Sequence, residues 1–298
     1  MSPAHPGSCL THTSSLVPHT SYLTTSYLKP DSMSAFTLQS SEGLPIRGEI
    51  DAAEKPRALV VVVHGFKGFK DWGFFPWTAQ RLMQHRLAVC RFNMSRSGIG
   101  DDPESFDRLD LFEHDTYSTQ LRDLDVVVRH AQREFPGLPT FVFGHSRGGG
   151  IAILGAQDVP NLHGVVAWSP ISRVDRWDDA VKRDWRKRGV LEVENARTKQ
   201  VMRMAPVMLD DYEANAERLD VLAAASRLTV PLLVIHGGRD ESVAVDEGRA
   251  IAARAPLGSI AVLGRASHTF NAIHPLIHVP FELLAAAELT AHFVNAYA

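Results

Sequence analysis

The chain contains little cysteine, little excess charge and no long apolar segment. Only two cysteines, Cys9 and Cys90, occur in 298 residues. Because the first lies in a polar segment and the second in an apolar run, we expect no disulfide and a reducing compartment, with the cytoplasm as the location. The formal net charge of −3 gives no general attraction to nucleic acid. No apolar run approaches the roughly 20 residues that a membrane-spanning helix needs, so we expect no membrane span.

The N-terminal segment also lacks the features of a secretory signal. No lysine or arginine precedes Lys29, and the segment is rich in Ser, Thr, His and Pro instead of having an apolar middle. We therefore expect residues 1–33 to form a flexible tail and residues 34–298 to form the folded domain. The sequence also lacks the glycine patterns of dinucleotide-binding and phosphate-binding loops, and no cluster of metal-ligand residues stands out. We expect neither a cofactor nor a metal ion.

The sequence does contain short apolar runs that alternate with segments of helical periodicity. Near-continuous apolar runs are typical of parallel strands that are covered on both faces. The alternation predicts an α/β fold with a mostly parallel central sheet flanked by helices. The runs of strand length are residues 57–64, 87–92, 140–145, 164–169, 231–237 and 259–264, and the helical segments are residues 74–85, 115–135, 245–255 and 281–298.

The pattern also predicts a helix N-cap and an insertion. Asp115, at the start of its helical segment, is the expected N-cap. Residues from about 170 to 228 are too many for one connection, so we expect them to form a helical cap insertion. The large apolar residues of the insertion either pack it onto the core or line a substrate pocket; they are Trp177, Trp185, Met202, Met204 and Met208.

The motif Gly-His-Ser-Arg-Gly, residues 144–148, lies between a predicted strand and a predicted helix. A turn of this kind holds its central residue in a strained conformation and exposes the side chain at the carboxyl end of the sheet, where α/β folds build their sites. Gly144 and Gly148 leave room for strand and helix to approach each other. Ser146 is therefore the candidate nucleophile.

A serine nucleophile needs a base and a third group that orients the base. The loop after the strand at 231–237 carries Asp240, and the loop after the strand at 259–264 carries His268. The chain order serine, aspartate, histidine is that of one known arrangement of such a triad. We predict His268 as the base and Asp240 as its partner, with Glu241 and Asp175 as alternative acids.

Acyl transfer also needs donors for the oxyanion of the transition state. One is expected to be the backbone N–H of Arg147, directly after the nucleophile at the start of a helix. The other is expected in the loop that follows the strand at 57–64, which begins His-Gly-Phe. This places the backbone N–H of Phe66 at the site.

With these residues, the chain resembles the α/β-hydrolase superfamily and, within it, the dienelactone-hydrolase-like and serine-aminopeptidase-like esterases. The resemblance covers roughly residues 34–298 and implies the α/β-hydrolase fold, with the insertion as its variable cap. It implies the same roles for Ser146, Asp240 and His268, and for the N–H groups of Phe66 and Arg147. Dienelactone hydrolases use cysteine as the nucleophile, where this chain has serine.

We therefore predict a serine hydrolase that cleaves a small-molecule carboxylic ester through an acyl-enzyme intermediate, without a nucleic-acid partner. A small peptidase or amidase with the same triad is the alternative enzyme. A binding protein that kept the fold without catalysis is the alternative from another class. The sequence yields no prediction of the oligomeric state or of the acyl and alcohol groups.

Overall fold

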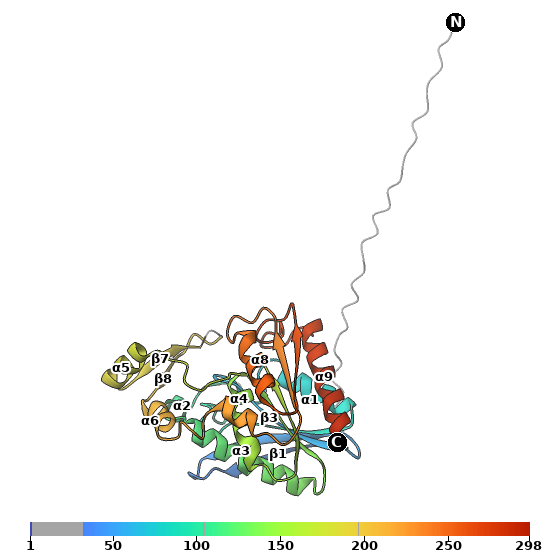
Figure 1. Cartoon of the computed structure of the whole chain (residues 1–298), viewed down its shortest axis with the longest axis horizontal. Helices are drawn as coiled ribbons and strands as arrows, with labels where there is room; N and C mark the ends of the chain where they lie inside the picture. Colours follow the sequence, from blue (N-terminus) through green and yellow to red (C-terminus); the bar gives the residue numbers. More distant parts are fainter. Residues whose placement is uncertain (2–31, 104, 196) are drawn as a thin grey trace.

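A computed structural model describes Met1 and residues 32–103, 105–195 and 197–298. Its central sheet has eight strands, and the pairs on one edge, β1 with β2 and β2 with β4, are antiparallel. The other neighbouring pairs are parallel, as the alternating sequence pattern predicts (Figure 1). In spatial order the strands are β1 (Ser32–Gln39), β2 (Pro45–Ala52), β4 (Leu87–Phe92), β3 (Ala58–Val63), β5 (Thr140–His145), β6 (Leu162–Trp168), β9 (Leu232–Gly237) and β10 (Gly258–Leu263).

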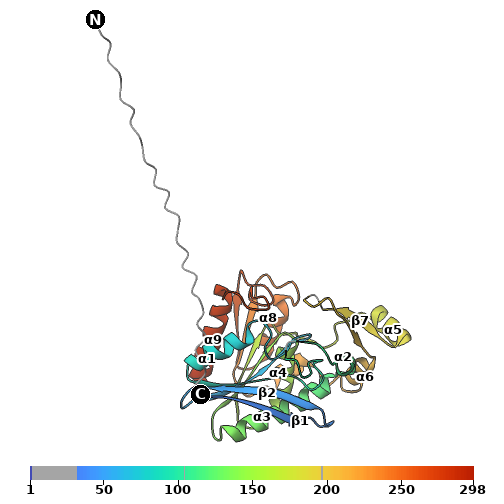
Figure 2. The ribbon, with the colours of Figure 1, turned by 180° about the vertical axis from the view of Figure 1, so that it is seen from behind.

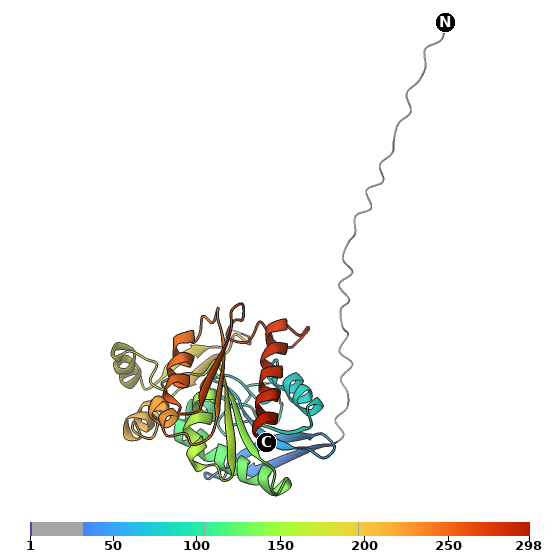
Figure 3. The same cartoon turned by 45° about the vertical axis from the view of Figure 1, so that its right-hand side comes forward.

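Helices cover both faces of this sheet, as Figure 3 shows. One face packs against two helices, α1 (Phe75–Gln84) and α9 (Phe281–Tyr297), which contact each other. On the other face lie α3 (Tyr117–Glu134), α4 (Arg147–Gly155), α7 (Val221–Ser226) and α8 (Val245–Arg254). Two short elements complete the described helices of the main domain, namely α2 (Leu109–Glu113) and the single turn η1 (Ala156–Asp158).

The sheet has a hydrophobic core on each face, and successive residues of a strand belong alternately to one core and the other. In β3, Val60 and Val62 belong to the core on the α1 and α9 face, whereas Val61 and Val63 belong to the core on the α3 and α4 face. All six residues of β3 are buried. Burial on both faces explains why this strand reads as a continuous apolar run in the sequence.

The antiparallel edge of the sheet was not predicted. Figure 2 shows β1 and β2 side by side at that edge. In β2, Ile46 and Ile50 are buried while Pro45 and Arg47 are partly exposed, which is the alternation of a half-buried strand. The predicted tail, residues 1–33, lies outside the described residues except for Met1 and for residues 32 and 33, with which β1 begins.

The insertion after β6 contains more than helices. It carries α5 (Asp179–Arg188) and α6 (Val207–Ala214), but between them β7 (Leu191–Glu194) and β8 (Val201–Met204) pair as an antiparallel hairpin. In β8, exposed and buried residues alternate. The predicted helical insertion thus also contains a two-stranded sheet, which was not predicted because this period of two was overlooked.

The large apolar side chains of the insertion pack inward. Trp185 and Met202 are almost completely buried, and both belong to the core on the α3 and α4 face. The indole N–H of Trp185 donates to the carbonyl of Met204 at 2.7 Å, and its ring centre lies 5.1 Å from that of Trp177. Of the two interpretations that the sequence left open, this burial favours core packing.

The N-cap of α3 is Thr116 and not Asp115. The Thr116 hydroxyl oxygen accepts a hydrogen bond from the Thr119 N–H at 3.1 Å, which is the usual capping contact. Asp115 is instead buried, one residue before the cap, where its carboxylate faces Gln120 and Arg147. The predicted N-cap therefore lies one residue before the observed one.

Candidate active site

Ser146 occupies the sharp turn between β5 and α4. Its backbone has φ 57° and ψ −120°, a conformation that non-glycine residues rarely adopt. The turn is held by hydrogen bonds on both sides, because the Ser146 N–H donates to the carbonyl of Trp168 at 2.8 Å and the Ser146 carbonyl accepts from the Gly149 N–H at 3.0 Å. Ser146 therefore lies at the carboxyl end of the sheet and at the N-terminus of α4.

The glycines on either side of Ser146 allow a close contact of backbones. A Cβ atom on Gly144 would lie 2.1 Å from the carbonyl oxygen of Gly148. A Cβ atom on Gly148 would lie 2.2 Å from the carbonyl oxygen of Val63, at the end of β3. Neither position can hold a side chain without moving the backbone.

Asp240 and His268 are in direct contact. The Nδ1 atom of His268 lies 2.8 Å from Oδ2 of Asp240, and the Asp240 side chain is completely buried. The other oxygen, Oδ1, accepts the N–H groups of Ser242 and Val243, each at 2.9 Å. Burial opposes ionisation of this carboxyl, but hydrogen bonds from His236 and His268 outweigh it and hold its pKa well below the usual range. The carboxylate thus keeps the proton on Nδ1 and leaves Nε2 of His268 as the basic nitrogen.

The two alternative acids lie elsewhere. Asp175 pairs with Lys182 at 2.5 Å. Glu241 is exposed beside Asp240. The structure therefore brings His268 together with Asp240, the first of the three predicted acids.

Two buried histidines that the sequence analysis did not single out support this pair. His145 Nε2 donates to the carbonyl of His268 at 2.9 Å, and the two ring centres lie 4.8 Å apart. Since His145 directly precedes Ser146, this bond ties the turn to the His268 loop. Burial lowers the pKa of His145 to about 3, so it remains neutral. His236 Nε2 lies 3.4 Å from Oδ2 of Asp240.

The loop after β3, residues 64–73, lies against Ser146. We call it the β3 loop. A Cβ atom on Gly65 would lie 3.2 Å from the Cβ of Ser146. His64 fixes the start of the loop, because its Nδ1 donates to the Gly65 carbonyl at 2.9 Å and its Nε2 accepts the N–H of Met94 at 3.2 Å. Burial lowers the pKa of His64 to about 4, which keeps the ring neutral and suited to both bonds.

Charged residues anchor the far end of the β3 loop to the sheet. The Lys70 N–H donates to Oδ1 of Asn93 at 2.7 Å, and its ammonium group lies 2.6 Å from Glu49 of β2. Arg91 of β4 pairs with Asp71, the next residue of the loop. These contacts explain the charges of Lys70 and Asp71 without a substrate, and they hold the loop where Phe66 lies beside α4.

The structure places the two predicted N–H donors as follows. Arg147 is the first residue of α4, where a backbone N–H has no partner within the helix. Phe66 directly follows Gly65, the residue whose backbone approaches Ser146. A cavity of about 10 Å³, no larger than one water, lies behind this part of the loop.

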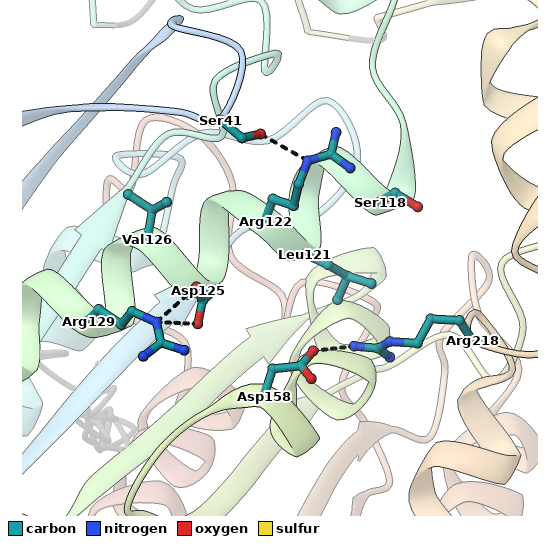
Figure 4. Close-up of a pocket in the computed structure, with 9 residues that line it drawn as sticks. All are labelled: Ser41, Ser118, Leu121, Arg122, Asp125, Val126, Arg129, Asp158 and Arg218. Atoms are coloured by element: carbon teal, nitrogen blue, oxygen red, sulfur yellow. Dashed lines mark hydrogen bonds and ion pairs between the residues drawn. The ribbon is translucent and has the colours of Figure 1, made fainter.

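A wider groove of about 500 Å³ lies along α3 (Figure 4). No predicted site residue is among the described residues that line it. Each arginine that lines the groove donates a hydrogen bond to a neighbouring side chain. Arg122 donates to Ser41, Arg129 to Asp125 and Arg218 to Asp158. The described lining consists of Ser41, Ser118, Leu121, Arg122, Asp125, Val126, Arg129, Asp158 and Arg218.

Within the described ranges, no helix is long and apolar enough to cross a membrane. Nor do the described residues include three or more His, Cys, Asp or Glu side chains grouped so that they could hold a metal ion.

Solved structures resemble this fold over most of its length. Est1E from Butyrivibrio proteoclasticus superposes with a TM-score of 0.64 at 16% identity, covering 88% of this chain and 98% of the other. A dienelactone hydrolase from Anabaena variabilis gives a TM-score of 0.60 at 17% identity, covering 89% and 98%. The chain has the α/β-hydrolase fold. This confirms the predicted fold.

Sequence comparison matches a shorter part of this chain. The family model described as serine aminopeptidase, S33 matches residues 54–191, which include the β3 loop and Ser146. Human monoglyceride lipase is 32% identical over 117 residues, which are 39% of this chain and 36% of the lipase. A monoglyceride lipase homolog of monkeypox virus is 29% identical over 121 residues, 40% of this chain and 41% of the homolog. The match thus spans less than half of these relatives.

Proposed function

We propose that this protein is a serine hydrolase of the α/β-hydrolase superfamily and that it cleaves a small-molecule carboxylic ester. The observation that carries the proposal is the buried Asp240 carboxylate hydrogen-bonded to His268, on a loop that His145 ties to the strained turn at Ser146. The monoglyceride lipase matches support an ester as the substrate.

In the first half of the reaction, the Ser146 hydroxyl oxygen attacks the ester carbonyl carbon while Nε2 of His268 takes the hydroxyl proton. The carbonyl oxygen becomes an anion, which the N–H groups of Phe66 and Arg147 bind. Asp240 stabilises the imidazolium that forms on His268. When the tetrahedral intermediate collapses, the bond to the alcohol oxygen breaks and His268 gives its proton to that oxygen.

In the second half, a water molecule attacks the acyl-enzyme and gives a proton to Nε2 of His268. The new tetrahedral intermediate collapses with release of the carboxylic acid, and the proton returns to the Ser146 oxygen. No step of this cycle changes an oxidation state. The chain's own side chains and N–H groups supply every acid, base and donor that the cycle uses.

The serine aminopeptidase family match favours a second candidate, a peptidase or amidase that uses the same residues. The chemistry differs only in the leaving group, an amine in place of an alcohol. A panel of p-nitrophenyl esters from acetate to palmitate, assayed beside aminoacyl p-nitroanilides, separates the two. Preferential cleavage of esters supports the first function, and preferential cleavage of anilides supports the second.

The decisive variant is Ser146→Ala. We expect it to lower kcat by about 10⁶-fold, as the loss of a catalytic nucleophile does. Ser226→Ala is the matched control, because it removes an exposed hydroxyl from the end of α7 and should leave the rate unchanged. A folded Ser146→Ala variant that keeps most of its activity refutes the assignment. A folded wild-type protein that cleaves nothing and does not react with a fluorophosphonate probe favours the non-catalytic alternative.

A further inference from the structure

The side chain of Arg147 lies under the β3 loop and away from solvent. The residue is 6% exposed, and its guanidinium carbon lies 4.0 Å from the centre of the Phe66 ring. On α3, the ring of Tyr117 lies 5.1 Å from the same carbon. A guanidinium within about 6 Å of a ring centre is attracted to the face of the ring. Aromatic rings from two separate elements therefore hold this cation.

The contacts of the cation with polar groups are weak. Its Nη1 atom lies 3.9 Å from Oδ2 of Asp115, too far for a hydrogen bond. Among the described residues, Nη1 of Arg147 and Oδ1 of Asp115 are both buried without a hydrogen-bond partner. An ion pair alone does not explain why an arginine is buried here, since its closest well-formed contact is with Phe66.

Phe66 also contacts a second aromatic ring. Its ring stacks on Phe112 of α2 with the ring centres 5.6 Å apart. The next residue, Lys67, has φ 55°, a conformation that a non-glycine residue keeps only when its surroundings impose it. The backbone around Phe66 thus needs external contacts, and Arg147 supplies one of them.

We propose that the Arg147 side chain is a positioning residue, which locks the β3 loop onto the start of α4 and thereby fixes the two oxyanion donors relative to each other. The inference rests on the proposed function. Its basis is that the same two residues, Phe66 and Arg147, contribute the N–H groups and are joined through their side chains.

This arrangement predicts a specific kinetic effect. Removal of one oxyanion donor costs about 10²–10³ in rate, so a donor that is displaced and not removed should cost about tenfold in kcat. KM should change little, because the contact acts on the transition state more than on the bound ester. Lysine keeps the charge but lacks the flat guanidinium face, so it should restore activity only in part.

The experiment compares Arg147→Met and Arg147→Lys with wild type on the best p-nitrophenyl ester. Arg218→Met is the matched control, because Arg218 donates to the Leu154 carbonyl near the opposite end of the same helix and pairs with Asp158. Affinity for an alkyl boronic acid, which forms a tetrahedral adduct with the serine, is measured beside kcat and KM. It reports on the oxyanion site without turnover.

We expect Arg147→Met to lower kcat about tenfold and boronic acid affinity by a similar factor, with KM within twofold of wild type. The kcat and the boronic acid affinity of Arg147→Lys should lie between those of Arg147→Met and wild type. Both quantities should match wild type in Arg218→Met. An unchanged kcat in Arg147→Met, or a change in KM alone with unchanged boronic acid affinity, overturns the inference.

If Arg147→Met does not fold, Phe66→Leu tests the same contact by changing its aromatic partner. The expected loss of kcat and boronic acid affinity is the same, and so is the result that would overturn the inference. A wild-type protein without Ser146-dependent turnover would instead overturn the proposed function, and this inference with it.

Discussion

Replacing Gly148 by alanine is expected to separate the start of α4 from the end of β3. The new Cβ atom would lie 2.2 Å from the carbonyl oxygen of Val63 and 2.5 Å from that of His64. Real Cβ atoms keep at least 3.0 Å, so the two backbones must move apart by about 0.8 Å. Both obstructing atoms belong to the backbone, and no rotation of a side chain can relieve the contact.

The magnitude follows from this displacement. Overpacking of a well-packed interior costs about 1–3 kcal/mol, and a backbone clash of this size should lie near 3 kcal/mol. For a domain of this length, that corresponds to a fall in melting temperature of roughly 6–12 °C. The shift also moves Arg147 away from the β3 loop, and a displacement approaching 1 Å at a catalytic site can cost about 10² in rate.

The assay is urea unfolding followed by circular dichroism, with ester turnover measured on the same preparations. Gly264→Ala is the matched control, because a Cβ atom at Gly264 meets nothing within 4 Å. We expect this control to remain within about 0.5 kcal/mol of wild type. A Gly148→Ala variant with wild-type stability and turnover would refute the argument that this contact sets the geometry of the turn.

Two further predictions concern buried carboxyl groups. Asp240→Asn should lower kcat by about 10⁴-fold, because an amide in place of the carboxylate no longer keeps the proton on Nδ1 of His268; a loss below tenfold in steady-state ester hydrolysis would contradict the role of this pair. Burial raises the pKa of Asp115 from 3.8 to about 7, so the folded protein keeps a proton that the unfolded chain releases. The associated stabilisation is complete below about pH 4 and is lost as the pH rises to about 7. Asp115→Asn should therefore remove a few kcal/mol of pH dependence from the free energy of unfolding over this window, and identical pH profiles in urea titrations of the two proteins would contradict the prediction.

The parallel part of the fold could be predicted because burial on both faces makes its strands apolar throughout. The same criterion missed β1, whose residues 35–39 alternate between exposed and partly exposed, and β2, which is half-buried. It also missed the hairpin of β7 and β8, whose four-residue strands alternate. In each case the signal was a period of two. A search for continuous apolar runs alone does not detect that period.

The candidate site was predictable as far as its positions depend on sheet topology. Each of the three predicted catalytic residues, Ser146, Asp240 and His268, follows a strand of the parallel part of the sheet, and the carboxyl ends of these strands lie at the same end of the sheet. In the structure, Asp240 and His268 are hydrogen-bonded to each other. The supporting contacts were not predictable, because they depend on side-chain directions. In the sequence, nothing distinguishes His145 from the other residues of the glycine-rich motif. Its hydrogen bond to the His268 carbonyl becomes evident only in the fold.

The order of the strands also sets when the proposed chemistry becomes available during synthesis. Ser146 lies near the middle of the chain, whereas Asp240 and His268 follow β9 and β10, which form one edge of the sheet. A growing chain that ends before β9 carries the nucleophile but neither its base nor the acid. Contacts between residues so far apart in sequence form slowly. On the proposed function, ester cleavage therefore requires that β9 and β10 have joined the sheet, which a growing chain that ends before β9 cannot do.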